Sequence, residues 1–214
     1  MTAAVFRNAM RPLSTKDIQT SMKKGGISMP LIQTHRLTLR RMSLDDRAGI
    51  AAILQDPQVM TAYEHAFSDA EVEEWIARQL ARYEQYGFGL WAVIRKEDGR
   101  LIGQAGLTMQ ETPEGQVLEI GYLFAKAHWH QGYATEAAEG CKQYAFGPLN
   151  SDAVFCIIRD NNFASQRVAT RIGMRPVGQF VKHYYGMDMP HIVYRITREE
   201  CGLPSIGTPD GSIA

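Results

Sequence analysis

The chain of 214 residues has few cysteines and no long hydrophobic run. Cys141, Cys156 and Cys201 are an odd set without CxxC or Cys/His spacing, which argues against a disulfide framework and against a zinc site. No apolar stretch approaches the roughly 18 residues of a membrane span, and the N-terminus has no apolar segment typical of a secretory signal. These absences predict a soluble cytoplasmic protein with no metal and no membrane partner.

Neither sign of charge is in excess, because 23 Lys and Arg residues balance 23 Asp and Glu residues. A balanced charge gives no reason to expect a nucleic-acid partner. The content of 45% hydrophobic and 21% charged residues is that of an ordinary globular protein. Two halves of this chain would each be close to the lower size limit for a stable core, so one domain is expected.

Composition divides the chain into three segments. Residues 1–28 are small, polar and basic without a sustained period, and are predicted to be a flexible extension that folding does not require. Residues 29–200 carry the periodic hydrophobic patterns of the predicted domain. Residues 201–214 contain two prolines and three glycines and are predicted to be a loose tail.

Hydrophobic periodicity predicts an alternation of strands and helices along the domain. Strand patterns cover residues 31–41, 89–95, 100–108, 116–124, 153–158, 176–184 and 190–197. Helical patterns cover residues 43–55, 68–86, 131–146 and 162–172, and Ser68 with Glu71 forms a capping box. Turn residues at Asp98-Gly99 and near Pro113 make the middle three strands an antiparallel meander. This order predicts an α+β domain whose mixed sheet is covered by helices.

The stretch EIGYLFAKAHWHQGYATEAA, residues 119–138, places a strand, a turn and a glycine directly before a helix. The first amides of a helix lack internal partners and carry partial positive charge, so a pyrophosphate can accept several backbone hydrogen bonds there. Gly132 and Ala134 leave room for such an approach. An ordinary strand-to-helix connection is the alternative, because one glycine is a weak signal.

The segment HWHQGYATEA resembles the acyl-CoA pyrophosphate loop of Gcn-type N-acetyltransferases, the GNAT family, in the RimJ/RimL branch of ribosomal-protein alanine acetyltransferases. The family pattern is Arg or Gln, two residues, Gly, one residue, then Gly or Ala. Its six places are taken here by Trp129, His130, Gln131, Gly132, Tyr133 and Ala134. Trp129 replaces Arg or Gln, and His130 stands where the branch often has Gly. The resemblance implies main-chain contacts to acetyl-CoA along the turn from Gln131 to Thr135.

Other motifs extend the resemblance to about residues 31–197, in the order LIQTHRLTLR, RLIGQAGL, EIGYLF and DNNFASQRVATRIGM. It implies a GNAT-type fold with a mixed, mostly antiparallel central sheet of about seven strands and about four flanking helices. It further implies that acetyl-CoA enters a gap between residues 119–124 and 153–158, bonded by main-chain groups of Tyr122, Leu123 and Phe124. Asn162 would bond the pantetheine arm and Ser165 would lie near the thiol, although both residues also suit a plain helix start.

Acetyl transfer to an amine needs a base for the amine and an acid for the departing thiolate. We expect Glu119 to be the base, with a structural pairing to an Arg as the alternative, and Glu64, His65 and His183 as other candidates. Many GNAT enzymes use a Tyr acid where this chain has Ala169, so Ser165 is the expected substitute, with water as the other option. The aromatic residues Tyr63, Phe67, Tyr184 and Tyr185 either rim the acceptor site or belong to the core.

The resemblance predicts an enzyme that moves an acetyl group from acetyl-CoA to a primary amine by direct attack in a ternary complex. The acceptor is a protein N-terminus or a small amine, and the protein is a monomer or a homodimer. A catalytically silent acetyl-CoA sensor is the alternative, favoured by the missing Tyr. A nucleotide-binding P-loop is disfavoured, because no Lys-Ser or Lys-Thr follows Gly132.

Overall fold

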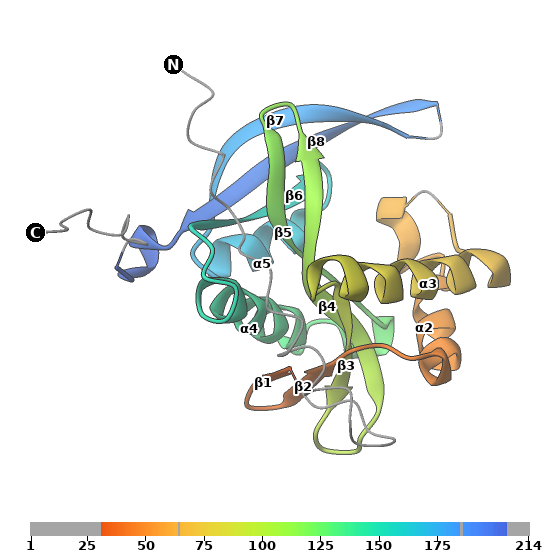
Figure 1. The fold of residues 1–214 in the computed structure, drawn as a ribbon. Coiled ribbons are helices and arrows are strands. Elements are labelled where there is room, and N and C mark those ends of the chain that lie inside the picture. The colour runs from red at the N-terminus through yellow and green to blue at the C-terminus, as the bar shows by residue number, and fades with distance from the viewer. Residues whose placement is uncertain (1–30, 64, 185, 205–214) are drawn as a thin grey trace, which may run out of the picture.

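A computed structural model of the protein describes residues 31–63, 65–184 and 186–204 (Figure 1). The predicted extension 1–28, most of the predicted tail, Glu64, Tyr185 and the side chain of Tyr184 lie outside the described residues. Among the helices of the described part, none has the length and apolar character needed to cross a membrane.

One mixed sheet runs through the domain in the strand order β1-β2-β3-β4-β5-β6-β8-β7. All neighbouring strands are antiparallel except β5 and β6, which are parallel. The strands are β1 (Ile32–Gln33), β2 (Leu37–Arg40), β3 (Leu90–Arg95), β4 (Leu101–Thr112), β5 (Gly115–Phe124), β6 (Ala153–Arg159), β7 (Arg175–Tyr184) and β8 (Met187–Thr197). The predicted α+β fold with a mixed, mostly antiparallel sheet is therefore confirmed.

The eighth strand comes from the stretch 31–41, which alternates like one strand but folds as the short hairpin of β1 and β2. A tight turn closes the hairpin, because the Thr34 N–H donates to the Leu37 carbonyl at 3.0 Å and the Leu37 N–H donates to Thr34 Oγ1 at 3.1 Å. Hydrophobic alternation continues on both sides of the turn, so the pattern alone does not reveal the break.

Four α-helices cover the two faces of the sheet (Figure 1). Helices α2 (Arg47–Leu54) and α3 (Asp69–Tyr86) pack with Leu90 and Ala92, whereas α4 (Tyr133–Phe146) and α5 (Phe163–Arg171) join the cluster that contains Trp91 and Val93. Successive strand residues point to opposite faces. The two helix pairs therefore bury opposite sides of one sheet.

Helix α3 begins as predicted, with Ser68 as its N-cap and a capping box to Glu71. It buries a stripe formed by Val72, Trp75, Ile76, Gln79 and Tyr83, which is the spacing of one helical face. Gln79 and Tyr83 fix the neighbouring strand β3, because both side chains bond main-chain groups of Leu90. Helix α3 is thereby fastened to β3, and the Trp75 indole N–H ties it to β4 by donating to Gln104 Oε1 at 2.9 Å.

Candidate active site

The parallel strands β5 and β6 separate after a single register pair, Glu119 with Phe155. On its other side β5 stays paired with β4 along its length, and the Ala125 N–H donates to the Ile102 carbonyl at 3.0 Å. Peptide groups alternate in direction along a strand. The groups of Leu123 therefore face β4, while those of Tyr122 and Phe124 face the separation from β6.

Two side chains bond the β5 carbonyls that face this separation. The Trp129 indole N–H donates to the Phe124 carbonyl at 2.8 Å, and the Cys156 thiol donates to the Ile120 carbonyl at 3.4 Å. Between them, the main-chain groups of Tyr122 make no hydrogen bond to any described residue outside the strand ladder. At Tyr122 the edge of β5 therefore has main-chain groups that no described residue pairs, and such groups can bond an added extended ligand.

The turn before α4 has the backbone of an anion site. Gly132 is the N-cap with φ 81°, and His130 also has a positive φ of 59°. Among the described residues, the backbone N–H groups of residues 130–135 find no acceptor. Helix N-termini with free amides and partial positive charge bind phosphate groups. The donor set present at this turn therefore fits a pyrophosphate.

Side chains of the turn hold its shape rather than point at a ligand. Gln131 donates through Nε2 to the Ala127 carbonyl at 3.1 Å, and the buried Tyr133 ring packs edge-on against His128. Ala134 and Thr135 are partly buried on the first turn of α4. Trp129 is 38% exposed although its indole N–H is bonded. The predicted binding residues of this loop thus lie on one turn, whose side chains bond and pack within it.

At the start of α5, Asn162 is the N-cap and accepts a hydrogen bond through Oδ1 from the Ser165 N–H at 3.1 Å. Its Nδ2 donates to no described residue, which leaves the predicted bond to pantetheine possible. The Tyr122 hydroxyl donates to the Ser165 carbonyl at 3.0 Å and ties β5 to this helix start. Burial raises the pKa of Tyr122 well above its usual value, so the phenol stays protonated.

Replacing Asn162 by Ala should destabilise the protein by about 1 kcal/mol, because the cap of α5 is lost. Asn162→Asp is the matched control, since the carboxylate keeps an acceptor for the Ser165 N–H. Chemical denaturation measures both free energies of unfolding. Equal stability of Asn162→Ala and the wild type would contradict the capping role.

Glu119 projects from β5 at the point where β5 and β6 part. Its Oε2 accepts from the Thr108 hydroxyl and its Oε1 from the Ile157 N–H, both at 3.2 Å. The second bond replaces a ladder bond that the separated strands no longer make. Glu119 is therefore bound to main chain and hydroxyl, and among the described residues no arginine pairs with it directly.

The surroundings of Glu119 shift its proton affinity upward. Burial raises the pKa of Glu119, while the Lys182 ammonium, the hydrogen bonds from Ile157 and Thr108, and the Arg82 guanidinium oppose this. Lys182 lies on β7 and Arg82 on α3, so cations approach the carboxylate from two sides. A carboxylate with a raised pKa is a stronger base at neutral pH than an exposed one.

The other candidate bases lie on two segments. His65 precedes α3 and pairs with Glu71 at 2.7 Å, and His183 on β7 pairs with Asp188 at 2.8 Å. The rings of Tyr63 and Phe67 make edge contacts with each other and with Trp75. The side chains of Tyr63 and Phe67 are partly buried against the hydrophobic cluster under α2 and α3, so both contribute to packing.

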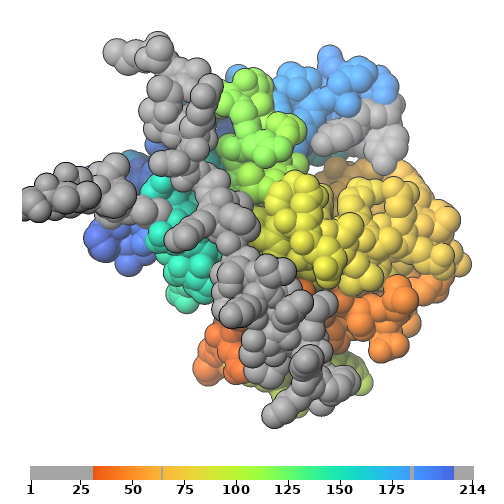
Figure 2. Space-filling view, in the orientation of Figure 1, coloured from red at the N-terminus to blue at the C-terminus, as the bar shows by residue number. Residues whose placement is uncertain are grey.

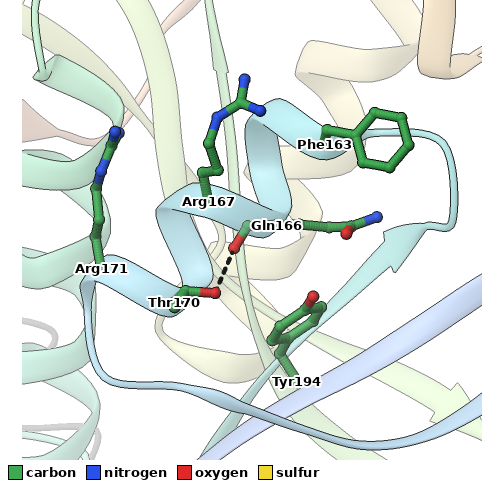
Figure 3. A pocket seen from close by; sticks show the side chains of 6 residues that line it. All are labelled: Phe163, Gln166, Arg167, Thr170, Arg171 and Tyr194. Carbon is green, nitrogen blue, oxygen red and sulfur yellow. Dashed lines mark hydrogen bonds between the residues drawn. The ribbon is translucent and has the colours of Figure 1, made fainter.

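A surface pocket lies on α5. Figure 3 shows its lining, which consists of Phe163, Gln166, Arg167, Thr170, Arg171 and Tyr194. Arg167 and Arg171 are one turn apart, and the Thr170 hydroxyl donates to the Gln166 carbonyl at 3.0 Å. No residue that the sequence predicts for the site belongs to this lining.

Sequence reasoning did not identify Thr108, the Tyr122 hydroxyl or Arg36 as parts of the site. Thr108 and Tyr122 contact Glu119 and Ser165, as described above, and Arg36 contacts Gln131 across 95 residues of sequence. Strand alternation places Thr108 and Glu119 on similar faces only once their register is known. No sequence pattern around Arg36 predicts its role, because its partners Gln131 and Glu136 lie in a distant segment of the chain.

The Acetyltransferase (GNAT) domain family matches residues 36–175. The uncharacterized protein YkkB of Bacillus subtilis is 38% identical over 142 residues, covering 66% of this chain and 83% of YkkB. The uncharacterized N-acetyltransferase YoaA of the same organism is 26% identical over 164 residues, covering 76% of this chain and 92% of YoaA.

A solved structure of RimL, a ribosomal L7/L12 alpha-N-protein acetyltransferase in complex with coenzyme A, is similar in fold with a TM-score of 0.64. It is 14% identical in sequence, and the match covers 79% of this chain and 98% of RimL. The mixed, mostly antiparallel sheet agrees with the family match, and this chain belongs to the GNAT family of acetyltransferases.

Proposed function

We propose that the protein transfers the acetyl group of acetyl-CoA to a primary amine by direct attack in a ternary complex. Two neighbouring features together carry this proposal. Strand β5 has an edge at Tyr122 that no described residue pairs, and the helix that follows begins with amides at residues 130–135 that find no acceptor among the described residues. The family match supports acetyl transfer in general. The RimL neighbour was solved with coenzyme A, which supports the choice of donor.

In this mechanism the amides of the turn from Gln131 to Thr135 bind the pyrophosphate. The pantetheine arm lies along β5, where the Tyr122 main chain is open, and Asn162 donates to it through Nδ2. An amide of this edge polarises the thioester carbonyl as its oxygen gains charge. With these contacts in place, Glu119, which lies where β5 and β6 separate, would be the carboxylate available to an amine that attacks the thioester.

Glu119 accepts a proton from the acceptor ammonium, directly or through a water molecule. The neutral amine then attacks the thioester carbon, the new C–N bond forms, and the C–S bond breaks. The Ser165 hydroxyl gives a proton to the departing thiolate and regains one from the nitrogen of the new amide, since Ala169 offers none, and the proton held by Glu119 passes to solvent. The products are the acetylated amine and free coenzyme A.

The acceptor class follows the RimJ/RimL resemblance: a protein N-terminus, or a small amine in its place. A free-thiol assay with acetyl-CoA over N-terminal peptides, amino acids and polyamines tests this directly. We expect thiol release above the hydrolysis background with at least one primary amine.

A silent acetyl-CoA sensor is the second candidate, because the residue at the family's tyrosine position is the fully buried Ala169. Thermal stabilisation by acetyl-CoA without thiol release from any amine would favour the sensor. Thiol release with a primary amine would exclude it.

A further inference from the structure

Arg36 lies in the β1–β2 turn and contacts the segment 131–136, which leads into helix α4, at three points. Its Nη1 donates to the Gln131 carbonyl at 2.9 Å, and its Nε pairs with Glu136 Oε2 at 2.7 Å. Its guanidinium carbon lies 4.4 Å from the centre of the Tyr133 ring. One side chain therefore touches the residue before the N-cap, the first helical residue and the first-turn acid.

The contact to Gln131 sets the direction of the next amide. The carbonyl of Gln131 and the N–H of Gly132 belong to one planar trans peptide, so they point in opposite directions. When Arg36 holds the carbonyl on its own side, the Gly132 N–H faces away from Arg36. Arg36 thus fixes an amide that would otherwise depend on a flexible glycine.

Arg36 also binds the Glu136 carboxylate, together with Thr34. Glu136 Oε1 accepts from the Thr34 hydroxyl and the Arg36 N–H, both at 2.6 Å. These hydrogen bonds and the Arg36 guanidinium hold the pKa of Glu136 below its usual value, against its burial. A carboxylate in the first turn stabilises an empty helix end but repels a phosphate. The paired guanidinium offsets that repulsion.

We propose that Arg36 is a positioning residue for the pyrophosphate of acetyl-CoA, acting through the Gln131 carbonyl and the Glu136 carboxylate. This inference rests on the proposed function, because it assumes that the phosphates bind at residues 130–135. It assigns a donor-binding role to the β1–β2 turn, which lies at the edge of the sheet.

The test compares Arg36→Gln with the wild type for two donors. Calorimetry gives the dissociation constant of coenzyme A, and the thiol assay gives kcat/KM for S-acetylpantetheine, which has no pyrophosphate. We expect the constant for coenzyme A to rise roughly 10- to 100-fold, the scale of losing hydrogen bonds to charged groups. We expect kcat/KM for S-acetylpantetheine to change by less than about 3-fold, since that donor makes no phosphate contact.

Arg40→Gln is the matched control. Arg40 is the last residue of β2, the strand that follows Arg36, and binds both oxygens of Asp46 at 2.7 Å, but it makes no contact with residues 130–135. Its loss should lower the melting temperature without changing the ratio between the two donors. Glu136→Gln should weaken coenzyme A binding less than Arg36→Gln, because Arg36 keeps its bond to Gln131.

Three results would overturn the inference. They are unchanged coenzyme A binding by Arg36→Gln, an equal loss for both donors, and an equal loss for Arg36→Gln and Glu136→Gln. The proposed function is tested separately by Gly132→Val. If Gly132→Val abolishes binding while Arg36→Gln does not, only the role of Arg36 fails; if neither variant affects binding, the phosphate site itself is wrong.

Discussion

Gly132→Val should raise the dissociation constant of coenzyme A by about 10²-fold or more, as expected when several charge-assisted bonds are lost together. Gly132 has φ 81°, a left-handed conformation that valine adopts only under strain. A Cβ atom there would lie 3.4 Å from Arg36 Nη2, which is an ordinary contact, so the strain comes from the backbone conformation. The turn then loses the shape that presents its amides.

Calorimetry with coenzyme A measures this effect, and Gly178→Val on β7 is the matched control. A Cβ at Gly178 would meet nothing within 4 Å, and its φ is not in the left-handed range. The control should bind coenzyme A as the wild type does. A Gly132→Val protein that folds and keeps the wild-type affinity would remove the phosphate site from residues 130–135.

Glu119→Gln should lower turnover by roughly 10²-fold or more with little change in acetyl-CoA affinity, the usual scale for losing a positioned base. The amide keeps the shape, and its oxygen still accepts from the Ile157 N–H. The loss should shrink at high pH, because an amine with a pKa near 10 is then increasingly neutral without help. Steady-state rates across pH, on an acceptor found by the thiol assay, measure both effects.

The exposed Glu111 on β4 supplies the control, since Glu111→Gln makes the same chemical change on a neighbouring strand. It should leave turnover unchanged. If Glu119→Gln keeps wild-type turnover at neutral pH, Glu119 has only the structural role of bridging β5 and β6. Attention would then move to His65, His183 and Glu64.

The raised pKa of Glu119 also predicts a change in stability. Between the unfolded and the folded pKa, the folded state binds more protons, so stability falls as pH rises through that window. Above it the folded state carries the full cost of an ionised buried carboxylate, although Lys182 and Arg82 reduce that cost. Glu119→Gln should therefore melt at a higher temperature than the wild type at neutral pH, and the difference should shrink in acid. A lower melting temperature at neutral pH would show that the carboxylate stabilises the fold.

The sequence by itself determined the class of the fold and the glycine that precedes helix α4. Alternation and helical periodicity are local properties, so seven strand patterns and four helices were readable, including the capping box of α3. A glycine directly before a helix was readable for the same reason, whereas its left-handed conformation is a finding of the structure. The split of residues 31–41 into two strands was not, because the turn is closed by hydrogen bonds that leave the hydrophobic pattern intact.

Only the tertiary structure decided which groups meet at the site. The direction of the Tyr122 and Leu123 peptide groups depends on which strand β5 pairs with, and a one-residue change of register would exchange them. The environment of Glu119 depends on the point where β5 and β6 separate, because that point exposes the Ile157 N–H to its carboxylate. Arg36 reaches Gln131 and Glu136 only through the packing of α4 against the sheet edge. Contacts between distant segments arise from burial and register, and neither is encoded in the local pattern.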